Sequence, residues 1–290
     1  METKELLKKV RKIEIKSRGL SANLFSGEYH SAFKGRGMSF SEVREYQAGD
    51  DIRTIDWNVT ARLNHPYVKI YEEERELTMM LLIDVSQSGM FGTHKMLKQE
   101  LITELCAVLS FSSLQNNDKI GVIFFTDRIE KFIPPKKGKT HVLRIIREML
   151  EIEPKSKATD LSMALKYLIN VAKKRCTAFV ISDFMDSAPF DDQLKIAAKK
   201  HDLIALPIQD MRETELPNMG LAQFADMETG KIEWIDTSSR TIRKQFAEYH
   251  IKRQAQLKTL FNRSGVDFAT LQTDRSYVNP IINLFKRRNK

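Results

Sequence analysis

The sequence predicts an α/β fold with a doubly wound, mostly parallel sheet. After Glu76, apolar runs typical of strands alternate with helical patterns, which favours a parallel sheet covered by helices. The run Leu77–Val85 is almost entirely apolar, as expected of a strand buried on both faces. Only Asp127 and Arg128 separate two of the strand candidates, so one edge strand is expected to be antiparallel.

Each element is predicted from its periodicity and its flanking polar residues. The predicted strands are Leu77–Val85, Lys119–Thr126, Ile129–Ile133, Cys176–Ile181, Leu203–Pro207, Ile232–Ile235 and Val266–Leu271. The predicted helices are a short one around Leu6–Ile13, then His94–Gln115, His141–Leu150, Asp160–Ala172, Asp191–Lys200, an amphipathic helix that begins at Ser238 or Ser239, and Tyr277–Phe285. Residues 17–75 show no sustained period of either kind.

We therefore expect an irregular N-terminal segment (1–75), an α/β domain (76–237) and a basic helix, strand and helix (238–290) packed on that domain. From Ser239 to Lys290 the chain has 12 Lys and Arg against 3 Asp and Glu, so the whole formal charge of +9 arises there. Such a segment can attract nucleic acid, an anionic membrane or an acidic protein. Its basic residues are spaced as an ordinary solvated helix face, and that interpretation is favoured.

Several classes of protein are disfavoured by the sequence. No apolar stretch approaches the roughly 20 residues of a membrane span, and the N-terminus lacks the apolar run of a secretory signal. The two cysteines, Cys106 and Cys176, make no disulfide framework and are expected to be buried thiols. We therefore expect a cytoplasmic protein.

Polar residues that could hold a metal ion follow the predicted strands. Asp84, Ser86 and Ser88 alternate at the end of the first strand, so their side chains can converge. Thr159 precedes a helix, and Asp183 follows the strand that ends at Ile181. Ligands of open parallel sheets bind at the carboxyl ends of the strands. Carboxylate and hydroxyl oxygens suit magnesium better than zinc or copper, although manganese and calcium remain possible.

This pattern resembles the metal-ion-dependent adhesion site of von Willebrand factor A domains. The resemblance implies that Ser86 and Ser88 coordinate a divalent ion directly. It implies direct or water-mediated coordination by Thr159, and mostly water-mediated contacts for Asp84 and Asp183. Such an ion keeps an open position that attracts a carboxylate from another molecule.

A second resemblance covers nearly the whole chain. Four segments, Phe40–Arg62, Tyr71–Glu76, Ile133–Gly138 and Ile181–Phe184, are similar to bacterial domain-of-unknown-function family fifty-eight. The resemblance implies a von Willebrand factor A-like domain that acts with a MoxR-type AAA+ ATPase.

The first of these segments mixes charges of both signs with aromatic residues. Its charged residues are expected to form ion pairs that attach the N-terminal region to the sheet domain, or else a surface for a partner; they are Arg44, Asp50, Asp51, Arg53, Asp56 and Arg62. Trp57 is expected to be a core anchor.

Enzyme motifs are incomplete. The segment Lys137–Thr140 lacks the earlier glycine of a phosphate-binding loop, since Ile133 occupies its place. No Gly-x-Ser-x-Gly elbow is present, and the histidines lack zinc-site spacing. We therefore expect a non-enzymatic, metal-dependent module that binds a partner's Asp or Glu and serves as an adaptor or assembly factor. The alternatives are a metal-dependent hydrolase at the same site, or nucleic-acid binding through the basic C-terminal segment.

Overall fold

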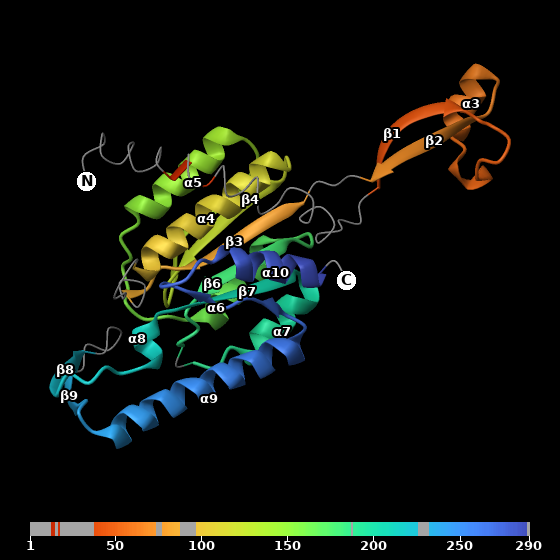
Figure 1. Cartoon of the computed structure of the whole chain (residues 1–290). Coiled ribbons are helices and arrows are strands. Elements are labelled where there is room, and N and C mark those ends of the chain that lie inside the picture. Colours follow the sequence, from red (N-terminus) through yellow and green to blue (C-terminus); the bar gives the residue numbers. More distant parts are fainter. Residues whose placement is uncertain are drawn as a thin grey trace. The chain divides into compact units, whose positions relative to one another are not determined.

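The computed structural model describes residues 13–14, 17, 38–73, 77–87, 97–186, 188–225 and 232–288. The chain divides into two compact units, one of residues 33–77 and one of residues 1–32 and 78–290 (Figure 1). The helix predicted around Leu6–Ile13 lies almost entirely outside the described residues.

A mainly parallel sheet forms the centre of the larger unit. Among the described residues, seven strands belong to it, in the order β10-β7-β6-β3-β4-β5, with β11 also paired to β7. Their bounds are β3 (Thr78–Asp84), β4 (Lys119–Phe125), β5 (Ile129–Lys136), β6 (Thr177–Ser182), β7 (Asp202–Gln209), β10 (Asp267–Phe268) and β11 (Leu271–Gln272). Every neighbouring pair is parallel except β4 and β5. The predicted α/β fold with one antiparallel edge strand is confirmed.

Helices pack on both faces of this sheet. Their bounds are α4 (Lys98–Gln115), α5 (Lys139–Glu151), α6 (Leu161–Val171), α7 (Asp191–Lys200), α8 (Met211–Thr214), α9 (Arg240–Ser264) and α10 (Val278–Arg288). The helices α4 and α5 contact each other, as do α6 and α7, and α9 packs on α7 (Figure 1). A buried bond from the Tyr277 hydroxyl to Glu104 Oε1 (2.6 Å) ties the start of α10 to α4.

Burial on both faces explains the apolar sequence of β3. Met80 and Leu82 belong to a core cluster with Leu165 of α6 and Leu194 of α7. Successive side chains of a strand point to opposite faces, so Leu81 faces the other layer, and it is fully buried as well. A strand covered on both sides carries no alternation of polar residues, as the sequence predicted.

The turn between β4 and β5 is as short as predicted, and the two strands lie very close together at Gly121. A Cβ atom at this glycine would lie 2.9 Å from the backbone oxygen of Ile133 and 2.9 Å from the sulfur of Met80. The register of the two strands shifts between Ile120 and Val122. Only glycine allows this approach of the edge strand.

The smaller unit is more regular than the sequence pattern indicated. It contains an antiparallel pair, β1 (Met38–Glu45) and β2 (Tyr67–Glu73), a short 3₁₀ helix η1 (Ile52–Thr54) and a helix α3 (Trp57–Leu63). Trp57 is 67% exposed, so the prediction of a core anchor is wrong.

Some of the charged residues that were predicted to form ion pairs do so within this unit. Arg44 binds both carboxylate oxygens of Asp50, at 2.7 and 2.8 Å. Asp51 caps η1, and Asp56 caps α3 and pairs with Lys69 at 3.4 Å. These residues stabilise the local turns of the segment itself.

The C-terminal segment contains the predicted elements, and the strand predicted at Ile232–Ile235 is present but lies outside the main sheet. Ser239 caps the long helix α9, and β10, β11 and α10 replace the single strand and helix predicted after it. The strands β8 (Leu221–Ala225) and β9 (Ile232–Asp236) form a separate antiparallel pair. Part of the basic charge makes internal contacts: Arg288 pairs with Asp202 and Asp267.

Candidate metal-binding site

Two aspartates meet at the carboxyl ends of adjacent strands. Asp84 is the last residue of β3, and Asp183 directly follows the last residue of β6. The two strands are parallel neighbours, with Ile83 opposite Ile181. The chain continues from β3 to β4 on one side, whereas β6 lies on the other, so the order of strands reverses at β3. Such a reversal is where parallel sheets bind ligands.

The carboxylate of Asp84 is buried and held by two donors. The backbone N–H of Ser86 donates to Oδ1 (3.0 Å), and the Ser182 hydroxyl donates to Oδ2 (2.7 Å). Burial and the nearby Asp183 carboxylate raise the pKa of Asp84 to about 6, although the bonds from Ser182 and Ser86 oppose this rise. Burial therefore disfavours the charged form of Asp84, and the neighbouring carboxylate adds to this effect.

Asp183 is held by a backbone amide and by a lysine. The Met185 N–H donates to Oδ1 (3.1 Å), and the Lys98 ammonium donates to Oδ2 (3.1 Å). Lys98 also pairs with Glu213, and its side chain is only 1% exposed. Burial disfavours the charged form of Lys98, but the two carboxylates outweigh it and place its pKa above the ordinary value.

Thr159 lies in a loop bonded to three other segments of the site. The Gln87 N–H donates to the oxygen of Lys157 (3.4 Å), and the Asp160 N–H donates to the oxygen of Thr126 at the end of β4 (3.0 Å). The Leu161 N–H donates to Asp186 Oδ2 (2.8 Å), beyond β6. The buried Thr159 is thus carried between the ends of β3, β4 and β6.

The structure therefore gathers the segments of four predicted residues, Asp84, Ser86, Thr159 and Asp183, around one edge of the sheet. The fifth, Ser88, lies outside the described residues.

The donor set fits a hard divalent ion. Among the described residues, no three His, Cys, Asp or Glu side chains gather as a metal site, so hydroxyl groups would have to complete the coordination. Each oxygen of Asp84 and of Asp183 already accepts at least one hydrogen bond. A carboxylate oxygen retains a further lone pair for a water molecule. This arrangement suits aspartates that act through water.

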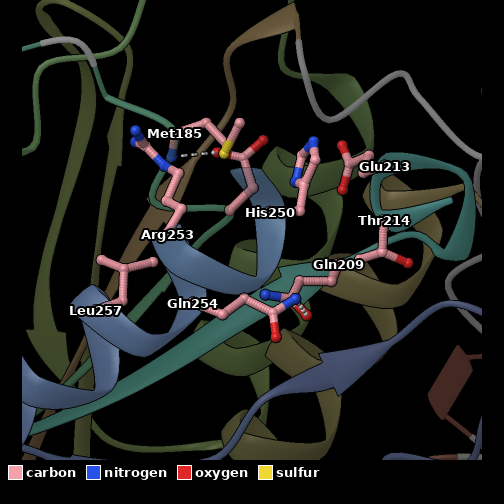
Figure 2. A pocket seen from close by; sticks show the side chains of 9 residues that line it. Met185, Gln209, Glu213, Thr214, His250, Arg253, Gln254 and Leu257 are labelled. Carbon is pink, nitrogen blue, oxygen red and sulfur yellow. Dashed lines mark hydrogen bonds between the residues drawn. The ribbon is translucent and has the colours of Figure 1, made fainter. Parts of the chain in front are cut away.

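The loop after Asp183 is strained and is held by α9. Phe184 has φ of 55°, which is uncommon for a bulky residue. Arg253 donates from Nη2 to the backbone oxygens of Phe184 (2.9 Å) and Asp186 (3.1 Å). Figure 2 shows His250 of α9 next to Glu213 and Arg253 on the Met185 side of the same pocket. These residues line a cavity of about 20 Å³. Arg253 therefore braces the turn that presents Asp183.

A larger pocket opens on the other side of Asp84. Its volume is about 290 Å³, and Asp84 and Ser86 line it together with Gln99. Ile102 and Met149 contribute an apolar wall. Asp84 and Ser86 therefore border a cavity large enough for a side chain of another molecule.

Several residues of this site were missed by the sequence analysis. Lys98 and Glu213 are 115 residues apart, and no local pattern pairs them. Arg253 belongs to the basic face of α9, which was interpreted as solvated. No local sequence pattern identified Lys98 or Arg253 as residues of the site, because their partners lie far away in the sequence.

Comparison with known proteins places the chain in a family. The "Uncharacterized protein Rv1480" of Mycobacterium tuberculosis is 28% identical over 284 residues, which cover 97% of this chain and 89% of the relative. Among solved structures, the chain is similar to BatB from Bacteroides thetaiotaomicron, at 15% identity and a TM-score of 0.48, over 73% of this chain and 98% of that one. It is also similar to the SpRpn10 VWA domain, at 8% identity and a TM-score of 0.43, over 72% and 94%.

In the described part of the chain, no helix combines the length and the apolar character that crossing a membrane requires.

The family model described as "Protein of unknown function DUF58" matches residues 42–256, about three quarters of the sequence. The chain belongs to this family.

Proposed function

We propose that this protein is a von Willebrand factor A-like binding module that takes up a divalent cation, most suitably Mg²⁺, and uses it to bind a partner's Asp or Glu. Ser86, Ser88 and Thr159 would hold the ion, with Asp84 and Asp183 behind them through water. Mn²⁺ and Ca²⁺ offer the same coordination chemistry.

The observation that carries this proposal is the pair of buried carboxylates on adjacent strand ends. Asp84 has its pKa raised to about 6 by burial and by Asp183. Two carboxylates in a buried position repel each other unless a cation or a proton separates them. A divalent cation would relieve this repulsion, and the neutral hydroxyl ligands would leave it attractive to a further anion.

The residues of the chain have distinct roles in this arrangement. Ser182 and the Ser86 amide orient the Asp84 carboxylate, and Lys98 with the Met185 amide orients Asp183. The ion would supply an electrophilic position for the incoming carboxylate. The pocket beside Asp84 gives the partner's side chain a path to that position.

We propose binding rather than hydrolysis because hydrolysis requires a positioned proton carrier. Two basic side chains near Asp183 are committed to other contacts. Lys98 is an ammonium ion held between two carboxylates, and Arg253 is bound to backbone oxygens. Both brace the site and neither is disposed to accept a proton.

We further propose that the partner is a MoxR-type AAA+ ATPase or one of its clients, and that this protein is an adaptor or assembly factor. The resemblance of Phe40–Arg62 to the family supports this part of the proposal. Binding of nucleic acid is disfavoured, because arginines of the basic C-terminal segment such as Arg288 make internal ion pairs.

The test combines metal binding with partner capture. Calorimetry with Mg²⁺ and with Mn²⁺ should show one binding site in the wild type and none in Asp84→Ala. Capture of the purified MoxR-type ATPase from the same genome should be lost in chelator and in Asp84→Ala. Asp192→Ala is the matched control, because its side chain is 87% exposed on α7.

Capture that persists unchanged both in chelator and in Asp84→Ala would exclude a metal bridge. Metal-dependent turnover of a generic phosphate ester that disappears in Asp84→Asn would instead favour the hydrolase.

A further inference from the structure

The most unusual group near the site is a buried lysine that sequence patterns did not indicate. Lys98 is 1% exposed, although lysine is almost never fully buried without a partner. It is also the first residue of α4, where the unpaired amides of a helix repel positive charge. Both its burial and its place at the start of the helix therefore disfavour the charged form of Lys98.

Two carboxylates compensate this charge, and both belong to the surroundings of the candidate site. The ammonium of Lys98 lies 3.1 Å from Asp183 Oδ2 and also pairs with Glu213 of α8. Three separate elements of the chain thus converge on one cation, since the pairs span 85 and 115 residues.

Stability alone is a poor reason for such an arrangement. Replacing a buried ion pair by apolar side chains of similar volume is often neutral or stabilising. Leu101 and Ile102 are buried one turn further along α4, and His250 lies near Lys98 as well. Methionine has a similar volume without the charge, so the charge itself requires an explanation.

We propose that Lys98 is a built-in counter-cation that lowers the affinity of the site for a divalent metal and raises its affinity for a partner's carboxylate. This inference rests on the proposed function. It makes occupancy of the metal site depend on the arrival of the partner.

The formal charges explain why Lys98 would have opposite effects on the affinities for the metal and for the partner. Asp84, Asp183 and Glu213 bring three negative charges and Lys98 one positive charge, which leaves two negative charges for one divalent cation. With Lys98 present, the metal-loaded site is neutral and accepts a further carboxylate readily. Without it, the site holds the metal more tightly, but the excess negative charge repels the partner.

The experiment titrates the full-length protein with Mn²⁺ alone, by calorimetry. Lys98→Met removes the charge at similar volume and should bind Mn²⁺ on the order of tenfold more tightly than the wild type. Glu213→Gln removes one negative charge, keeps one acceptor oxygen for either Lys98 or the Asp210 N–H, and should bind Mn²⁺ more weakly. Lys195→Met, at an exposed lysine of α7, should leave the affinity unchanged.

These opposite shifts separate an electrostatic role from a merely structural one. A structural role of Lys98 would lower stability in urea for both variants and would not tighten metal binding in either. Circular dichroism establishes that each variant is folded before titration.

The outcomes also distinguish this inference from the proposed function. Folded Lys98→Met that binds Mn²⁺ no more tightly than the wild type overturns the inference and leaves the metal site standing. If neither protein binds Mn²⁺, the metal site is wrong and the inference falls with it. Tighter binding by Lys98→Met, with weaker capture of the MoxR-type ATPase, supports both.

Discussion

Replacing Asp84 by Asn removes the carboxylate that the fold tolerates least. Burial and Asp183 raise its pKa from 3.8 to about 6. One pKa unit corresponds to about 1.4 kcal/mol, so ionised Asp84 costs the metal-free fold about 3 kcal/mol at neutral pH.

Asparagine removes this cost but loses one good hydrogen bond. The amide oxygen of Asn can accept the Ser86 N–H, but its NH₂ group then faces the Ser182 hydroxyl, which already accepts from the Phe184 N–H. The loss is about 1 kcal/mol. Asp84→Asn should therefore be more stable than the wild type by about 2 kcal/mol at pH 7 in the presence of chelator.

The extra stability of Asp84→Asn should increase as pH rises. Because the folded pKa of Asp84 lies above its unfolded value, the wild type binds more protons when folded, and its stability falls as pH rises from about 4 to about 6. His201 acts oppositely in this range, since burial lowers its pKa to about 4. Both proteins contain His201, so the difference between them isolates Asp84.

Urea unfolding in chelator, followed by circular dichroism at several pH values, measures this difference. The advantage of Asp84→Asn should be absent near pH 4 and complete near pH 7, and saturating Mg²⁺ should stabilise only the wild type. Asp192→Asn, at an exposed carboxylate, should show no such dependence. An Asp84→Asn protein that is less stable at pH 7, or a gap independent of pH, would refute the reasoning.

Two further changes probe other parts of the account. Arg253→Met removes the bonds to the backbone oxygens of Phe184 and Asp186, and should cost about 2 to 4 kcal/mol in urea unfolding. Exposed Arg263→Met should cost nothing measurable, and equal stability of the two variants would show that the brace is unimportant. Trp57→Ala should cost less than about 0.5 kcal/mol because this side chain is 67% exposed. A loss of several kcal/mol would mean that Trp57 is a core residue after all.

The sheet was predictable because its strands are buried on both faces. A run such as Thr78–Asp84 has no room for polar residues, and the short link at Asp127 allows only an antiparallel turn. Asp84 and Asp183 could be paired in advance because parallel strands end at one edge of the sheet. Burial and topology therefore carry most of the information.

Other features were not predictable because they depend on contacts across long sequence separations. In the sequence, Lys98 resembles an ordinary helix residue. Only the structure shows that it pairs with Asp183 and Glu213. In the sequence, Arg253 resembles the other residues of a solvated basic helix face. Its role depends on the turn at Phe184, whose backbone oxygen accepts a hydrogen bond from it.

The structure of the small unit was not predictable for a different reason. Short-range caps and ion pairs determine its structure, and the pair β1 and β2 shows little alternation in sequence.

The central claim is that a divalent ion binds between the ends of β3 and β6. The most direct measurement is a crystal structure of the protein grown with Mn²⁺, with data collected near the manganese absorption edge. The account predicts one anomalous peak beside Ser86, Ser88 and Thr159, with Asp84 and Asp183 in its surroundings. An occupied Mn²⁺ site elsewhere, or none at this edge of the sheet under saturating Mn²⁺, would contradict it.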